Sequence, residues 1–355
     1  MDNSSQRNIL RVSPEWETPK LAGEITSALA GDGPTLGFGQ ITSNYAPSDI
    51  AVVIGTSGTT GNPKEVALSA RAITSSAKAS NEFLGAKHGD TWSLLLPLTH
   101  IAAVNVFVRA LELGSAPLDL RNIEGNYPDA NFTAVVPTQL FRALNGESKL
   151  LKHLQNADKV LIGGASLSQG LRKQAVAAGI KVVSTYGMTE TCGGCVYDGE
   201  AISDVEFEVK NGRVRLKGNV LATTYLNAPW SLDTGWFETS DLGEIVDSKL
   251  VVLGRADDVI VSGGENISLS AIESSLAVAF PQLQTAAFSN NDPQWGQSLH
   301  LAVVGEISDE KILLHLEKDL GTVAKPKSIH HLSSLPLRGI GKIDREALAK
   351  EINRE

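Results

Sequence analysis

The chain has 355 residues, 42% of them hydrophobic and 20% charged, a composition typical of a globular protein with about two domains. Its formal net charge of -9 argues against a nucleic-acid binder, which would carry a basic surface. No stretch has the apolar length of a signal-peptide core or of a membrane span, so we expect no membrane span and a cytoplasmic protein.

The first informative segment is a run of glycine and hydroxyl residues that ends at Lys64. The apolar residues 51–54 predict a buried strand before it, and we expect the run to lead from that strand into a helix. Glycine lets backbone N–H groups approach an anion, hydroxyls add donors, and lysine adds positive charge. The run therefore predicts a phosphate-binding loop, with candidate residues Thr56, Ser57, Gly58, Thr59, Thr60, Gly61 and Lys64.

Between residues 51 and 184, strand-like and helix-like segments alternate. Short apolar runs at 93–96, 133–136, 160–162 and 182–183 alternate with helical stretches at 69–84, 101–113 and 168–178. This alternation predicts an α/β fold with a mostly parallel, doubly wound sheet.

The helix at 101–113 carries Asn105, Arg109 and Glu112 on one narrow stripe, while its other faces are apolar. The arginine needs an anionic partner. Glu112 at i+3 could form an intrahelical ion pair with it, or a substrate carboxylate could match its planar fork. The sequence leaves both interpretations open.

The only cysteines, Cys192 and Cys195, form a C-x-x-C motif. A zinc site would need a second ligand pair at comparable spacing, and none follows. We interpret the pair as small residues that line a loop, with metal or redox chemistry as the remaining alternatives.

The pattern changes after the cysteines. Apolar and polar residues alternate from Val205, and an Asn211-Gly212 turn predicts a hairpin within a small antiparallel region. Beyond the charged segment 254–258, helices near 270–279 and 309–320 and strands near 285–288 and 299–304 predict a smaller α+β domain. We expect a large domain at 1–254, a hinge at 255–258 and a lid domain at 259–355.

Five segments recur in an order that resembles the acyl-adenylate-forming superfamily, and together they span most of the chain. They are T-S-G-T-T-G-x-P-K at 56–64, S-T-Y-G-M-T-E-T at 184–191, T-S-D at 239–241, G-R-A-D-D at 254–258 and G-I-G-K at 339–342. The resemblance implies a mobile C-terminal lid and a reaction in which ATP activates a carboxylate for transfer to CoA. The stretch before Thr56 is shorter than the family's usual lead-in, and we expect the active site to be unaffected.

The resemblance also implies roles for individual residues. Tyr186 and Gly187 would lie against adenine, Thr189 would meet the α-phosphate, and Glu190 would help hold Mg²⁺, which prefers carboxylate oxygen. Asp241 and Arg255 would bind the ribose, and Asp257 would be the hinge pivot. Lys342 would be the catalytic residue. A lysine that reaches both the attacking carboxylate and the α-phosphate can neutralise the charge that they share in the transition state.

The chain has a histidine, His100, followed nine positions later by an arginine, Arg109. This pattern resembles that of the family branch that activates o-succinylbenzoate in menaquinone biosynthesis. That substrate has two carboxylates, so Arg109 would hold one while the other reacts near His100. Gly163, Gly164 and Ser166 would line the site for the aromatic ring.

The implied co-substrates are ATP and CoA with Mg²⁺, beside a small-molecule carboxylate. Other interpretations are a ligase for another aryl or fatty acid, a stand-alone adenylation domain, and a catalytically silent acyl-adenylate or nucleotide sensor. A homodimer is compatible with the sequence.

Overall fold

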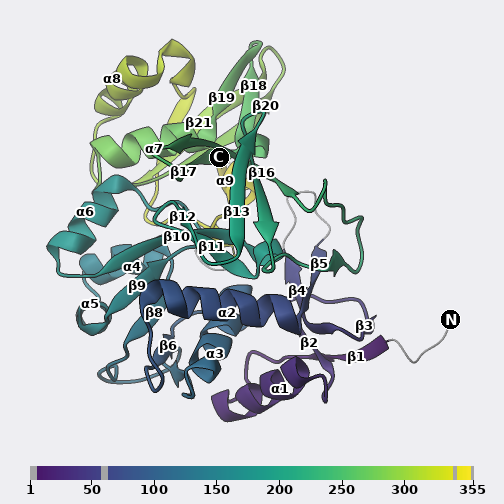
Figure 1. Cartoon of the computed structure of the whole chain (residues 1–355). Coiled ribbons are helices and arrows are strands. Elements are labelled where there is room, and N and C mark those ends of the chain that lie inside the picture. Colours follow the sequence, from purple (N-terminus) through teal and green to yellow (C-terminus); the bar gives the residue numbers. More distant parts are fainter. Residues whose placement is uncertain (1–5, 57–62, 339–341, 353–355) are drawn as a thin grey trace.

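A computed structural model describes residues 6–56, 63–338 and 342–352 (Figure 1). The N-terminal sheet has parallel strands at its centre, because β1, β2 and β4 run side by side in one direction. β3 and β5 flank them in antiparallel pairs, and β15 pairs antiparallel with β5. In spatial order the sheet comprises β15 (Thr224–Tyr225), β5 (Lys64–Ser69), β4 (Ile50–Thr56), β2 (Thr35–Phe38), β1 (Gln6–Arg11) and β3 (Tyr45–Pro47).

The second sheet is longer and contains five adjacent parallel strands, from β10 to β7. Two antiparallel strands extend it at the β10 edge. In spatial order it comprises β12 (Glu200–Ala201), β11 (Gly193–Tyr197), β10 (Val182–Met188), β9 (Lys159–Ile162), β8 (Phe132–Val135), β6 (Trp92–Leu94) and β7 (Leu118–Asp119). The predicted α/β class is confirmed, but the parallel strands are divided between two sheets.

Helices form the layer between these two sheets and also cover the outer face of the second. The helices of this region are α1 (Thr18–Ala30), α2 (Ala70–Leu84), α3 (Ile101–Glu112), α4 (Pro137–Leu144), α5 (Ser148–Asn156) and α6 (Gln169–Ala177). Buried residues of both sheets and of α1, α2 and α3 form one core, in which Trp92 and Phe107 are fully buried. A second core, which includes Leu154 and Ile162, packs α4, α5 and α6 on the other face of the second sheet.

An antiparallel sheet follows and leads to the C-terminal part of the chain. It comprises β13 (Val205–Lys210), β14 (Arg213–Gly218), β16 (Phe237–Val246) and β17 (Lys249–Arg255). The predicted hairpin is confirmed: Lys210 pairs with Arg213 across the turn, and both Asn211 and Gly212 have positive φ, as a type I′ turn requires. The 3-10 helix η3 (Ala256–Asp258) comes directly after β17.

The C-terminal part builds its own core from residues 260–349. Its sheet comprises β19 (Glu265–Ser268), β18 (Val259–Ser262), β21 (Gly296–Val304), β20 (Gln284–Asp292) and β22 (Ser328–His331). One face is covered by α7 (Leu269–Ala279) and α8 (Asp309–Leu320), and the other by α9 (Arg345–Ile352). A short hairpin of β23 (Leu337–Arg338) and β24 (Lys342–Ile343) precedes α9.

Figure 1 places the C-terminal part above the N-terminal sheets, with α7 over α6. The two regions touch there, since a side chain at Gly170 of α6 would meet Pro281 just after α7. Separate cores support the division that we expect near residues 255–258, which remains a prediction. Within the described residues, no helix is long and apolar enough to cross a membrane.

Candidate active site

Tyr186 and Asp241 come from different sheets and meet in a hydrogen bond. The Tyr186 hydroxyl donates to Oδ2 of Asp241 at 2.7 Å, and Asp241 is only 8% exposed. Burial, together with the neighbouring carboxylate, raises the pKa of Tyr186 well above its usual range, so the hydroxyl remains a donor. The tyrosine lies within β10, whereas the sequence predicted it directly after a strand. Its ring is therefore fixed by a strand on one side and by the carboxylate on the other.

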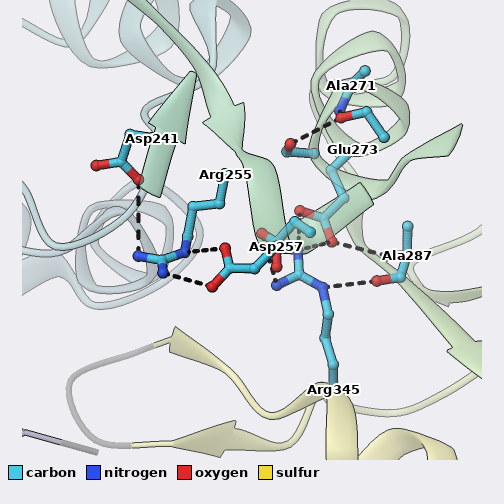
Figure 2. A network of polar contacts seen from close by, with 10 residues as sticks. Asp241, Arg255, Asp257, Ala271, Glu273, Ala287 and Arg345 are labelled. Carbon is cyan, nitrogen blue, oxygen red and sulfur yellow. Dashed lines mark hydrogen bonds and ion pairs between the residues drawn. The ribbon is translucent and has the colours of Figure 1, made fainter. Parts of the chain in front are cut away.

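Arg255 links Asp241 to the segment that follows β17 (Figure 2). Its Nε and Nη2 donate to the two carboxylate oxygens of Asp257, both at 2.7 Å. Its Nη1 lies 3.8 Å from Oδ1 of Asp241. The bond to Asp257 raises the pKa of Arg255 further above its already high value. The expected ribose-binding pair and the expected hinge aspartate thus form one ion-pair chain.

Glu190, in the 3-10 helix η2 (Thr189–Thr191), lies near the end of the predicted phosphate loop. The Tyr225 hydroxyl donates to Oε1 of Glu190 at 2.8 Å, and Nζ of Lys64 lies 4.8 Å from the centre of the Tyr225 ring. Burial and the Glu190 carboxylate raise the pKa of Tyr225 above its usual range. Tyr225 therefore fixes one carboxylate oxygen, which leaves Glu190 further lone pairs for a cation.

The phosphate run departs from our prediction in one respect, because it joins two antiparallel strands and not a strand and a helix. Thr56 of β4 pairs with Lys64 of β5, and Oγ1 of Thr56 donates to the Lys64 carbonyl at 3.2 Å. The apolar residues 66–68 extend a second buried strand before α2 begins. The candidates Ser57, Gly58, Thr59, Thr60 and Gly61 lie outside the described residues.

Two predicted glycines pack closely, Gly187 against backbone and Gly163 against a threonine side chain. A Cβ at Gly187 would lie 2.0 Å from the Gly193 carbonyl oxygen, and one at Gly163 would lie 2.3 Å from Oγ1 of Thr185. Larger residues would therefore force β10 away from its neighbours, and with it Thr189, which follows directly in η2. Gly164 and Ser166 are exposed in the segment between β9 and α6, apart from this packing.

The helix that carries His100 and Arg109 brings them to opposite ends, about two and a half turns apart. His100 is the N-cap residue of α3. Arg109 is 3% exposed, donates from Nη2 to the Tyr197 hydroxyl at 3.0 Å and lies over the Trp92 ring. The alternative partner Glu112 instead lies 3.8 Å from Lys78.

Two buried polar atoms on this helix have no hydrogen-bond partner within the described part of the chain: Nε of Arg109 and Oδ1 of Asn105. Asn105 uses its Nδ2 to donate to the Cys192 carbonyl at 2.6 Å. A buried donor without a partner is costly, so such atoms are typical of a place where a ligand completes the bonding.

Reasoning from the sequence missed three residues of this region, Tyr197, Tyr225 and Glu65. Glu65 is 1% exposed and accepts hydrogen bonds from Thr42 and Ser43. Burial alone would raise the pKa of Glu65, but these hydrogen bonds outweigh it, so the pKa is lowered. No motif contains these residues, and their partners are far away in the chain. A buried carboxylate directly after Lys64 was the one available signal.

The cysteines are both free and fully buried in the N-terminal core. Burial raises the pKa of Cys195 to about 12 and raises that of Cys192 as well, so neither is a ready thiolate. No cluster of three metal-ligating side chains occurs in the described ranges. The burial of both cysteines agrees with a packing role, but Cys195 lies in β11 and not in the loop that we expected.

Lys342 lies in β24, opposite Arg338. Lys342 is three residues before Arg345, whose guanidinium bonds the C-terminal sheet and α7.

Comparisons with known proteins agree on one family. Residues 6–219 match the family described as AMP-binding enzyme. The chain is 38% identical over 330 residues to a protein of Mycobacterium tuberculosis named "Probable 2-succinylbenzoate--CoA ligase", with 85% of this chain and 84% of that protein covered. It is 32% identical to the "2-succinylbenzoate--CoA ligase" of Lactococcus lactis subsp. lactis, with 87% and 73% covered.

Among solved structures, the fold resembles that of o-succinylbenzoate CoA synthetase (MenE) from Bacillus subtilis in complex with the acyl-adenylate intermediate OSB-AMP. The TM-score is 0.72 at 23% identity, over 92% of this chain and 80% of that chain. This likeness concerns the fold.

Proposed function

Because the chain belongs to the AMP-binding enzyme family, we propose that it is an ATP-dependent 2-succinylbenzoate–CoA ligase that acts through an acyl-AMP intermediate in menaquinone biosynthesis. The substrate assignment rests on the 38% identity, over 85% of this chain, with a protein named for that reaction. In the first step a carboxylate oxygen attacks the α-phosphorus of ATP and pyrophosphate leaves. In the second, the CoA thiolate attacks the acyl carbon and AMP leaves.

For the nucleotide, we assign Tyr186 and Gly187 to adenine and Asp241 and Arg255 to the ribose. The hydrogen bond from Tyr186 to Asp241 supports this, because it holds a flat aromatic ring beside the carboxylate that we assign to the ribose. Thr56 and Lys64, at the base of the β4–β5 hairpin, would meet the phosphates, together with the loop residues at 57–61.

For the metal, we assign one Mg²⁺ ligand to Glu190. Mg²⁺ is commonly bound by one or two carboxylates and by substrate phosphates, so a single protein carboxylate near Lys64 fits that pattern. When bound, the ion would neutralise charge on the phosphates. Tyr225 would orient the ligand through its bond to Oε1.

For the acid, we assign Arg109 to the non-reacting carboxylate, with Gly163, Gly164 and Ser166 along the aromatic ring and His100 near the reacting end. The Nε of Arg109 has no hydrogen-bond partner among the described residues, and this supports the assignment, since burying a guanidinium is costly unless it is paired. Thr189 and Lys342 would stabilise the charge at the α-phosphorus, and Asp257 would be the pivot between the two half-reactions.

The test is AMP release by the purified protein with a panel of carboxylic acids, with and without CoA. We expect 2-succinylbenzoate to give the highest kcat/KM, with AMP release that depends on CoA. Preference for a fatty acid or for a simple aryl mono-acid would exclude the substrate assignment. No AMP with any acid would favour the nucleotide sensor.

A further inference from the structure

Arg345 is the first residue of α9 and follows the β23–β24 hairpin. Its side chain bonds several segments of the C-terminal part at once (Figure 2). Its Nη2 lies 2.9 Å from each carboxylate oxygen of Glu273 in α7. Its Nε donates to the Ala287 carbonyl in β20 at 2.8 Å. Its Nη1 lies 3.6 Å from Oδ2 of Asp258 in η3. One guanidinium thus joins a helix, a strand and the segment between the two cores.

The contacts around Arg345 form a closed ring. Glu273 also accepts from the Ala287 backbone N–H at 2.9 Å, so the same residue of β20 donates to the carboxylate and accepts from the arginine. Burial raises the pKa of Glu273, while the charge of Arg345 and the hydrogen bonds from Ala287 and Arg345 act in the opposite direction. Only arginine offers a planar fork with enough donors for all three partners.

The hairpin passes directly into this anchor. β23 and β24 pair antiparallel, and the Asp344 N–H donates to the Pro336 carbonyl at 2.9 Å, which closes the hairpin base. Asp344 Oδ1 accepts from the Ala347 N–H and caps α9, and Leu348 is fully buried. The backbone between β24 and α9 is therefore held on both sides of Arg345.

We propose that Arg345 is a positioning residue for the adenylation half-reaction: through Glu273, Ala287 and Asp258 it fixes the strand that carries Lys342 relative to α7 and to the hinge. This inference rests on the proposed function, in which Lys342 acts at the α-phosphorus. A strand shifted by an ångström would misplace the lysine, and misplacement of that size can cost about a hundredfold in rate.

The test separates the two half-reactions in Arg345→Gln, Arg345→Lys and Glu273→Gln. Adenylation is followed by pyrophosphate release without CoA, and thioester formation by adding CoA to supplied acyl adenylate. We expect Arg345→Gln to slow adenylation about tenfold or more and to leave thioester formation within about threefold of wild type. Arg345→Lys should recover part of the loss, because it keeps the charge but not the fork.

The matched control is Lys327→Gln, which removes another ion pair of the same sheet, 2.7 Å from Asp292. It should leave both half-reactions near wild type. An equal loss in both half-reactions of the Arg345 and Glu273 variants would assign Arg345 a general structural role and overturn the inference. Wild-type adenylation in these variants would also overturn it.

A double variant tests whether Arg345 acts through Lys342. In a Lys342→Ala background, Arg345→Gln should add less than about threefold to the loss of adenylation, because residues that act as a unit are not additive. A full further loss would overturn the inference and leave the proposed function intact. If Lys342→Ala alone adenylates at the wild-type rate, both the inference and the assigned role of Lys342 fail.

Discussion

At the residue scale, the Tyr186 hydroxyl donates a hydrogen bond to Asp241, while we assign the Tyr186 ring to the nucleotide. Substitutions can separate the role of the hydroxyl from that of the ring. Tyr186→Phe keeps the ring and removes the bond to Asp241. We expect it to lower the free energy of unfolding by about 1–3 kcal/mol, because a buried carboxylate loses a donor. The KM for ATP should stay within a few-fold of wild type.

Tyr186→Ala is the contrasting variant and should raise the KM for ATP about tenfold or more, since stacking on a base is worth about 1–3 kcal/mol. Steady-state kinetics and urea unfolding on both variants measure these effects. Equal KM values for the two variants would show that the ring makes no contact with adenine.

Arg109 is the residue that we assign to the second carboxylate of the substrate. Removing one partner of a desolvated charge pair costs about 2–5 kcal/mol, so Arg109→Leu should lower kcat/KM for 2-succinylbenzoate by about tenfold or more. The KM for ATP should be unchanged.

The control is a mono-acid analogue that lacks the second carboxylate. Arg109→Leu should lose little further activity on it. An equal loss on both acids would mean that Arg109 serves only Tyr197 and the surrounding core.

At the element scale, the sequence predicted what depends on local pattern. The helix expected at 101–113 is α3, and the Asn211-Gly212 turn joins β13 to β14, because periodicity and turn chemistry are local properties. Contacts between distant residues could not be read in this way. Tyr186 and Asp241 are 55 positions apart, and Arg109 and Tyr197 are 88 apart. Tertiary packing brings such pairs together, between β10 and β16 in the first case and between α3 and β11 in the second.

The predicted strand-to-helix phosphate loop shows how one element can be missed. Residues 66–68 form a short apolar run just before a helix, and we did not predict a separate strand there. In the structure they pair with β4 as β5. A short apolar run fits a buried strand as well as a helical segment, and pairing with a neighbour decides between them.

Asp292 at the end of β20 gives a pH-dependent prediction. The bond from Lys327, followed by the N–H bonds from Gln294 and Trp295, lowers its pKa from 3.8 to about 2. A carboxyl whose pKa is lower in the folded state stabilises that state above its unfolded pKa, and this contribution is lost as the pH falls from about 4 through about 2.

Asp292→Asn should therefore be less stable than wild type near pH 7, and the difference should narrow below about pH 4. Urea unfolding across this range measures it, and Lys327→Gln should show the same narrowing. A difference that is constant with pH would contradict the assignment.

At the scale of the whole molecule, the N-terminal and C-terminal parts, which do not share a hydrophobic core among the described residues, are joined by a short charged segment. Asp257 in this segment holds the guanidinium of Arg255, while Arg255 also faces Asp241 of the antiparallel sheet. The arginine that we assign to the ribose is thus bonded to the aspartate that we assign as pivot, so the proposed nucleotide contact and the proposed rotation of the C-terminal part would share Arg255.

Asp257→Pro should separate the half-reactions, because proline fixes φ at the pivot. Adenylation should persist, and thioester formation should fall about tenfold or more if rotation is required. Asp257→Asn is the control, since it weakens the ion pair and keeps backbone freedom. Equal behaviour of the two variants in both half-reactions would show that rotation does not occur at Asp257.

The most direct measurement is mass-spectrometric detection of the acyl adenylate in the wild-type protein with ATP, Mg²⁺ and 2-succinylbenzoate but no CoA. We predict that the adenylate of 2-succinylbenzoate forms together with pyrophosphate, and that added CoA converts it to the thioester and releases AMP. If ATP is instead cleaved to ADP, or if the thioester forms with no adenylate detectable before CoA is added, the proposed two-step reaction is contradicted.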